Sequence, residues 1–192
     1  MSILKKNYGW IIVMIFASLP LIPLFNIGFS GTEEGIDMLY HISGEFAIRW
    51  MTAVLTCTPF FILFGVTNLF VRQAMGIATA VWSFLHFIIF IAAEGFMETF
   101  TQVNYVAGFI AVLILIPLFF TSNRKSMKRL KNNWKNLQRF IYAAIFLSLL
   151  HIVLLDKTWL IYAIVVSIGF IIRIPYVKNR IILIRKNRKT TN

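Results

Sequence analysis

The sequence has few of the residues on which soluble enzymes build their sites. It holds a single cysteine, Cys57, so it can form no internal disulfide and carries no zinc-type cysteine pattern. Seven acidic residues stand against nineteen basic ones, and there are three histidines. Neither a glycine-rich phosphate loop nor a Walker motif occurs. Soluble-enzyme chemistry therefore has no evident place here, and any flavin or nicotinamide domain would have to be another polypeptide.

Apolar residues are what the chain has in abundance. They make up 59% of the 192 positions, with a mean hydropathy of +0.78, well above the roughly 45–50% that is usual in soluble domains. Polar or charged segments separate six apolar runs, which span residues 10–28, 38–62, 73–93, 104–121, 138–155 and 158–175. Each approaches the roughly 20 residues that a helix needs to cross a bilayer. We therefore predict an all-α integral membrane protein, a six-transmembrane-helix bundle in a single domain over residues 1–192.

The first run begins like a signal peptide, because Lys5 and Lys6 precede it. It lacks a clear small-residue cleavage site, and we interpret it as a retained span. Pro20 and Pro23 are expected to kink this run or end it early, and Pro59 lies near the exit of the second run.

The segments between the runs alternate in charge. Acidic residues follow the first and third runs, whereas basic residues precede the first run, follow the second and fourth, and fill the tail at 178–189. The most basic loop is 123–135. Because positive loops stay inside, we predict that both termini are cytoplasmic and that the protein lies in the cell (inner) membrane. The net charge of +12 then reflects topology rather than nucleic-acid binding.

All three histidines, His41, His86 and His151, lie within the predicted spans. Polar side chains at bilayer depth are costly and usually face the bundle interior, where they serve a ligand, a relay or a hydrogen bond between helices. His86 follows Gln73 by 13 residues and His151 follows Gln138 by 13, about 20 Å of helix in each case. Because both spans run outward, the two imidazoles are expected at the same height in the outer half of the bilayer.

Two level imidazoles on separate helices are suited to supply both axial ligands of a heme that lies edge-on between them. The simpler interpretation is that each histidine only hydrogen-bonds to a neighbouring helix. Zinc is a poorer candidate, because no Cys, Asp or Glu is expected at that depth to complete four ligands. His41 lies beside the acidic loop, where it is a candidate to orient a heme propionate, to act as a third ligand or to anchor the membrane interface.

Other residues within the runs have simpler expected roles. Glu45 and Arg49 lie four residues apart on one helix turn and are expected to pair. Cys57 is expected to pack as a small apolar residue. Trp82 and the phenylalanines around His86 are candidates to pack against a porphyrin, although an aromatic stripe on a helix is more often ordinary core.

Three stretches of the sequence resemble a known family in order and spacing. HISGEFAIRWMTAVLTCTPF at 41–60, VRQAMGIATAVWSFLHF at 71–87 and NWKNLQRFIYAAIFLSLLH at 133–151 are similar to the ferric reductase-like transmembrane domain family. Within that family the likeness is greatest to the heme-binding membrane subunits of bacterial periplasmic methionine sulfoxide reductase systems. The similar core covers residues of about 37–157.

This resemblance implies a six-helix protein with b-type heme that accepts electrons from a quinol or a cytoplasmic flavin reductase. It implies that the electrons pass outward to a separate periplasmic molybdopterin-dependent reductase. His86 and His151 match family heme-ligand positions, and His41 matches a histidine that opens the second span. A stand-alone ferric or quinone reductase, and a non-redox transporter or scaffold with structural histidines, remain alternatives.

The sequence departs from the family pattern in its inner half. Gln138 stands where the family usually has a histidine, and Gln73 where a second basic residue usually follows Arg72. Glutamine is a poor ligand for heme iron, so we expect one heme, in the outer leaflet. About 20 Å of inner leaflet then remains to be crossed. A quinone or flavin (FMN) site is one candidate for that step, lined by Arg72, Gln73, Gln138 and Arg139; as snorkelling and capping residues these four need no such function.

Overall fold

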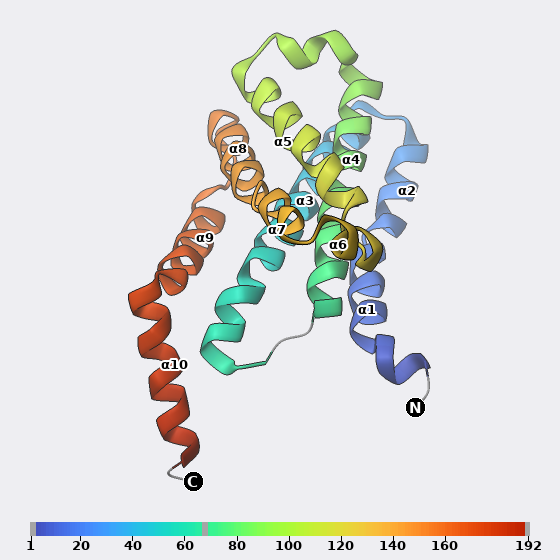
Figure 1. The fold of residues 1–192 in the computed structure, drawn as a ribbon. Coiled ribbons are helices and arrows are strands. Elements are labelled where there is room, and N and C mark those ends of the chain that lie inside the picture. The colour runs from blue at the N-terminus through green and yellow to red at the C-terminus, as the bar shows by residue number, and fades with distance from the viewer. Residues whose placement is uncertain (1–2, 67–68, 191–192) are drawn as a thin grey trace.

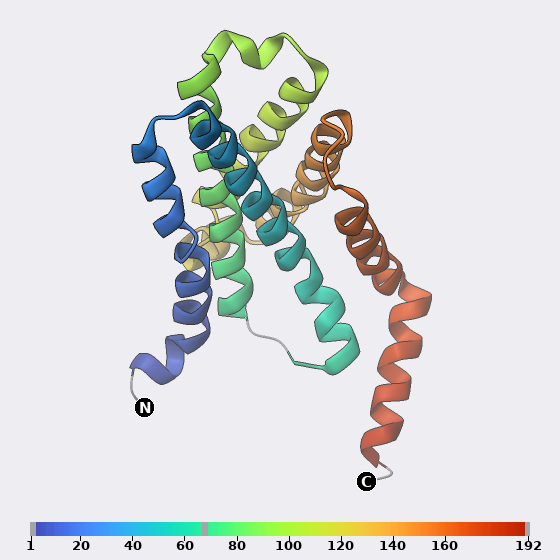
Figure 2. The same ribbon diagram turned by 180° about the vertical axis from the view of Figure 1, so that it is seen from behind.

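The computed structural model describes residues 3–66 and 69–190, and within these ranges the chain forms helices and no strand (Figures 1 and 2). The helices are α1 (Ile3–Ser18), α2 (Leu21–Ser30), α3 (Glu33–Phe64), α4 (Leu69–Glu94), the 3-10 helix η1 (Phe96–Phe100), α5 (Val103–Phe120), α6 (Arg124–Leu130), α7 (Asn132–Gln138), α8 (Ile141–Leu154), α9 (Leu160–Arg173) and α10 (Pro175–Thr190).

Five stretches of the described chain are helical, long and apolar enough to cross a membrane. They are Tyr8–Gly28, Glu33–Phe64, Phe70–Glu94, Val103–Phe120 and Asn132–Leu154. The pair α9 and α10 adds a sixth crossing if the two together count as one broken span. The chain is therefore a multi-pass helical membrane protein, which confirms the predicted fold class.

The sixth predicted run was wrong in its extent. α9 has 14 residues, and the residues predicted to form only a basic tail make a second helix, α10, bent by 76° from the first. The bend lies at Ile174, whose backbone is extended (φ −55°, ψ 129°). A residue before proline is pushed out of the helical region, and Pro175 follows directly. Proline also suits the first position of a helix, so the same residue ends α9 and starts α10.

The first run is divided between α1 and α2, as Pro20 predicts. Leu19 and Pro20 form a turn between the two helices, whereas Pro23 lies in the first turn of α2, where its missing N–H breaks no helical bond. The carbonyl oxygen of Ala17 lies at this break and accepts a hydrogen bond from the indole Nε1 of Trp82, 3.0 Å away on α4. This bond ties the broken span to the centre of the bundle.

Pro59 lies inside α3 rather than ending it. Because proline has no N–H, the carbonyl of Leu55 loses its helical donor. The guanidinium Nη2 of Arg173, in the last turn of α9, donates to that oxygen at 2.5 Å. A second helix therefore supplies the hydrogen bond that the proline removes.

The end of α3 receives a similar contact from α10. Arg185 Nη1 donates to the carbonyl oxygens of Phe61 and Ile62, at 2.8 and 2.9 Å. Gly65 ends α3 in the left-handed conformation (φ +76°), and a Cβ there would lie 3.0 Å from Arg185 Nη1. Glycine thus serves both the turn and the approach of the arginine.

The centre of the bundle is built from α3 and α4, with α5 and α8 packed together beside them and α9 against α3 (Figures 1 and 2). The buried hydrophobic core joins α3, α5, α8 and α9. Its residues are Ile48, Met51, Leu55, Leu115, Leu118, Ala144, Ile145 and Val166.

Charge is divided between the two ends of the bundle. All seven carboxylates lie at or near one end, on the first part of α3, at the end of α4, on η1 and after α8. They are Glu33, Glu34, Asp37, Glu45, Glu94, Glu98 and Asp156. The basic helices α6 and α7 lie near mid-height, away from the acidic end, and α10 runs to the far end, where α1 begins (Figure 1). We call the two halves the acidic half and the basic half.

Candidate functional site

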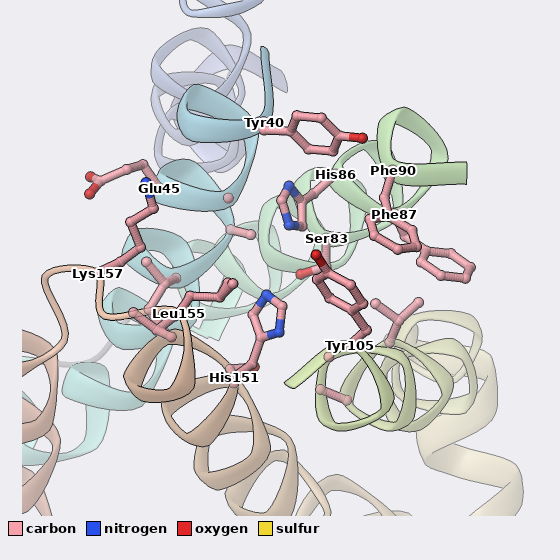
Figure 3. Close-up of a pocket in the computed structure, with 18 of the residues that line it drawn as sticks. Tyr40, Glu45, Ser83, His86, Phe87, Phe90, Tyr105, His151, Leu155 and Lys157 are labelled. Carbon is pink, nitrogen blue, oxygen red and sulfur yellow. The ribbon is translucent and has the colours of Figure 1, made fainter. Parts of the chain in front are cut away.

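A cavity of about 530 Å³ lies in the acidic half, between α3, α4, α5 and α8 (Figure 3). Core residues form its floor, among them Ile48, Met51 and Leu115. Polar side chains from the helix ends, such as Tyr40 and Lys157, form its mouth. The volume falls in the range of about 300–1,000 Å³ that is usual for small-molecule and cofactor sites.

His86 on α4 and His151 on α8 both face this cavity, and Figure 3 shows the two imidazoles directed toward each other. Their ring centroids lie 6.4 Å apart, with the ring planes 72° from parallel. The two imidazoles, on separate helices, are therefore close enough to face one ligand, as expected; their height in the bilayer remains a prediction. Their role as ligands remains a prediction at this point.

The hydrogen bond of His151 defines which of its nitrogens is free. Nδ1 lies 2.7 Å from the carbonyl oxygen of Asn104 on α5. A carbonyl only accepts, so Nδ1 carries the proton and donates it. In the neutral ring this leaves the lone pair of Nε2 unused.

His86 also carries its proton on Nδ1, in this case because of a hydrogen bond to a side chain. Its Nδ1 lies 3.0 Å from Ser43 Oγ, and that hydroxyl also lies 2.7 Å from the carbonyl oxygen of Leu39. The hydroxyl has one proton, which it donates to the carbonyl, so it accepts the Nδ1–H of His86. Both histidines are thus held in the form that presents a bare Nε2, the form in which imidazole binds a metal.

Two glycines let the imidazoles approach the neighbouring helices. A Cβ built on Gly44 of α3 would lie 3.2 Å from Cε1 of His86, and one on Gly108 of α5 would lie 3.1 Å from Nδ1 of His151. Each glycine therefore forms part of the seat of one ring. Sequence reasoning missed both, although small residues inside a span are a known signal of close helix packing.

His41 lines the same cavity but is exposed at its mouth. Tyr40 beside it donates to Glu94 Oε1 at 3.4 Å, linking α3 to the end of α4. Glu45 and Arg49 form an ion pair, as predicted, and Tyr162 Oη also donates to Glu45 at 3.2 Å. The mouth is therefore crossed by polar contacts between helices.

The aromatic residues near His86 divide into two groups. Phe87 and Phe90 line the cavity. Trp82 is engaged elsewhere: it is 2% exposed, stacks on Phe46 with 4.9 Å between centroids, and bonds to α1. Trp82 does not line the cavity, so its burial and contacts favour the second interpretation, that it is ordinary core.

The two inner glutamines both bind at the C-terminal end of α5, Gln138 in its last turn and Gln73 just after it. Gln73 Nε2 donates to the Ser122 carbonyl at 2.6 Å, and Gln138 Nε2 donates to Leu118 O at 3.3 Å and to Thr121 Oγ1 at 3.2 Å. The last carbonyls of a helix have no partner within the helix, so Gln138 caps α5, whereas Gln73 holds the residue that follows it. Arg72 and Arg139, the other residues predicted to line an inner site, are exposed.

Cys57 packs as expected of a small residue. It is partly buried in α3, and its Sγ lies 3.5 Å from Met75 Sδ on α4.

The fold and the cavity define a class: a multi-pass helical membrane protein with two facing histidines inside the bundle. The family of ferric reductase like transmembrane components matches residues 43–149, more than half of the chain. The chain belongs to this family, as the three quoted stretches predicted.

Curated relatives agree with this assignment. A protein-methionine-sulfoxide reductase heme-binding subunit MsrQ from Brucella ovis is 27% identical over 176 residues, covering 84% of this chain and 80% of the relative. The protein of the same name from Brucella anthropi is 27% identical over 188 residues, covering 89% and 86%. No solved structure matches the chain significantly.

Proposed function

We propose that this chain binds one heme b between His86 and His151 and conducts electrons through the membrane. The observation that carries the proposal is the pair of imidazoles, each with Nδ1 bound to protein and Nε2 free, facing one cavity. The relatives are named as heme-binding subunits, which supports the same conclusion.

The spacing of the two rings fits a single metal ion between them. An imidazole–metal bond is about 2.0 Å long, so two such bonds and the two ring radii give roughly 6 Å between centroids. The observed separation is 6.4 Å. Two imidazoles leave the other positions of an iron to a porphyrin, and a heme so held would supply a one-electron couple.

The residues around the pair have separate tasks in this proposal. Ser43 and Asn104 fix the orientation of the two rings and increase the basicity of the free nitrogens. Phe87, Phe90 and Leu115 keep water away from the space between the rings, which sets the dielectric around the iron.

We infer one heme rather than two. In the basic half, both glutamines already donate to the end of α5, and glutamine is a poor ligand for heme iron. A quinol or a cytoplasmic flavin reductase would then deliver the electron at that side. We retain Arg72, Gln73, Gln138 and Arg139 as the proposed edge of a quinone or FMN site.

Charge supports an orientation with the basic half in the cytoplasm, because positive loops stay inside. The protein would then lie in the inner membrane with its heme near the outer face. The relatives are named as subunits of a protein-methionine-sulfoxide reductase, so we propose such a reductase as the acceptor. The family resemblance implies that it is a separate, periplasmic, molybdopterin-dependent protein.

The test is a visible spectrum of the protein purified from heme-sufficient cells, before and after dithionite. We expect the narrow α-band of a reduced bis-imidazole heme b and one heme per chain. A colourless protein overturns the proposal, and two hemes per chain overturn the inference from the glutamines. Reoxidation by ferric chelates without any partner protein would favour a stand-alone ferric reductase.

A further inference from the structure

Thr99 carries a buried hydroxyl without a partner. It lies on η1, is 1% exposed, and its Oγ1 makes no hydrogen bond among the described residues. The same side chain lines the cavity that holds His86 and His151. Buried hydroxyls are nearly always hydrogen-bonded, so this hydroxyl needs a partner that the described residues do not supply.

One end of the cavity is apolar and the other is polar, which suits an amphiphilic ligand. Its floor is made of Ile48, Met51 and Leu115, whereas Tyr40, Glu94 and other polar side chains surround its mouth. A ligand with an apolar ring system and acidic arms therefore places the arms at the mouth. η1 follows α4 directly, so Thr99 belongs to the part of the cavity wall next to Glu94.

The carboxylates at the mouth of the cavity cannot donate hydrogen bonds, so a ligand carboxylate there depends on the few side chains that can. Four carboxylates line the cavity, and two of them already have partners: Glu94 accepts from Tyr40, and Glu45 pairs with Arg49. A further carboxylate gains nothing from such acceptors. It needs hydroxyl or cationic donors: Thr99 offers a hydroxyl from the cavity wall, and Lys157 offers a cation at the mouth.

The backbone around Thr99 is held in place. Thr101 donates to Glu98 O through its N–H at 3.1 Å and its hydroxyl at 2.9 Å. Phe96 and Phe100 contact the ring of Phe109 on α5, at 6.1 and 5.7 Å between centroids. A donor on a fixed segment loses little conformational freedom when it binds.

We propose that Thr99 donates a hydrogen bond to a propionate carboxylate of the heme. This inference rests on the proposed heme site and deepens it by naming a residue that fixes the orientation of the ligand. A hydrogen bond to a charged acceptor is among the stronger ones, so its loss is expected to weaken binding roughly tenfold.

The experiment compares Thr99→Val, which keeps the shape and removes the hydroxyl, with Thr99→Ser, which keeps the hydroxyl. Full-length apoprotein in detergent is titrated with heme and with heme dimethyl ester, in which both propionates are esterified. Thr99→Val should raise the Kd for heme roughly tenfold and leave the Kd for the ester nearly unchanged. Thr99→Ser should bind both as the parent does.

Thr52→Val is the matched control. Thr52 is also buried, at 8% exposure, with an unpartnered Oγ1, but it lies on α3 away from the cavity lining. Its substitution should leave both dissociation constants unchanged, and circular dichroism shows whether each variant keeps its helices.

Two outcomes overturn the role of Thr99 but leave the heme site standing. In the first, Thr99→Val weakens the binding of heme and of the ester equally; in the second, it weakens the binding of neither. A parent protein that binds neither form of heme overturns the heme site itself. The two failures are therefore distinguishable in one set of titrations.

Discussion

The acidic and basic halves of the bundle differ in whether their intramembrane polar side chains keep a group free for a ligand. In the acidic half, His86 and His151 each bind protein through one nitrogen and leave the other facing a cavity. In the basic half, Gln73 and Gln138 donate their amide protons to the end of α5. Each glutamine precedes its histidine by 13 residues, so α4 and the α7–α8 span carry both arrangements.

The difference teaches how to separate a binding group from a structural one in a membrane protein. Both pairs are polar side chains placed where lipid or core would reject them, and burial alone does not distinguish them. What distinguishes them is unused hydrogen-bonding or ligating capacity next to an open volume. The histidines have it, and the two amides are committed to α5.

Removing either histidine should have the largest effect. His86→Ala or His151→Ala would remove one of the two proposed heme ligands, and we expect each variant to lose most of its heme. Reduced-minus-oxidised spectra normalised to protein measure this. A variant that keeps a full complement of bis-imidazole heme would show that the proposed ligand is wrong.

Substitution of Gly44 or Gly108, the glycines that contact the two imidazoles, should have the second-largest effect on heme content. Gly108→Ala and Gly44→Ala place a Cβ 3.1 and 3.2 Å from the imidazoles, and overpacking of this kind typically costs about 1–3 kcal/mol. We expect reduced heme content and a shifted reduced band. Gly76→Ala is the control, because its Cβ would have 4.0 Å to the nearest side-chain atom. Equal losses in all three variants would assign the effect to helix packing in general.

The glutamines should affect stability and leave the spectrum unchanged. Gln73→Ala or Gln138→Ala removes a hydrogen bond at the end of α5, worth about 1 kcal/mol, and should lower Tm in detergent by a few degrees. Gln102→Ala is the control, since that glutamine is exposed at the start of α5 and makes no capping bond there. Loss of heme from Gln138→Ala would break the contrast between the two halves.

The features that follow from helix geometry could be predicted from the sequence. A fixed rise per residue turns equal spacing into equal height, so counting from Gln73 and Gln138 gave His86 and His151 the same expected height. Hydropathy gave the spans in the same way. Pro20 and Pro59 marked positions where helical hydrogen bonds are lost.

The partners of those positions could not be predicted, because they depend on which helices become neighbours. Nothing in the sequence pairs Arg173 with the Leu55 carbonyl, or Trp82 with Ala17. Ser43 was missed for the same reason, since its role exists only after α3 packs against α4. α10 was missed because its charge resembles that of a solvated tail.

The smallest effect should come from Ser43, and it sharpens a contrast within the acidic half. His151 donates to a backbone carbonyl, which no substitution removes, whereas His86 donates to the Ser43 hydroxyl. Ser43→Ala takes away that acceptor, makes Nε2 of His86 less basic and stabilises ferric iron less. We expect a higher midpoint potential and heme affinity weakened by roughly tenfold or less. Ser83→Ala, the same change at another serine of the cavity wall, controls for the lost hydroxyl. A redox titration in which Ser43→Ala and Ser83→Ala shift alike would show that the potential responds to cavity polarity and not to the hydrogen bond of His86.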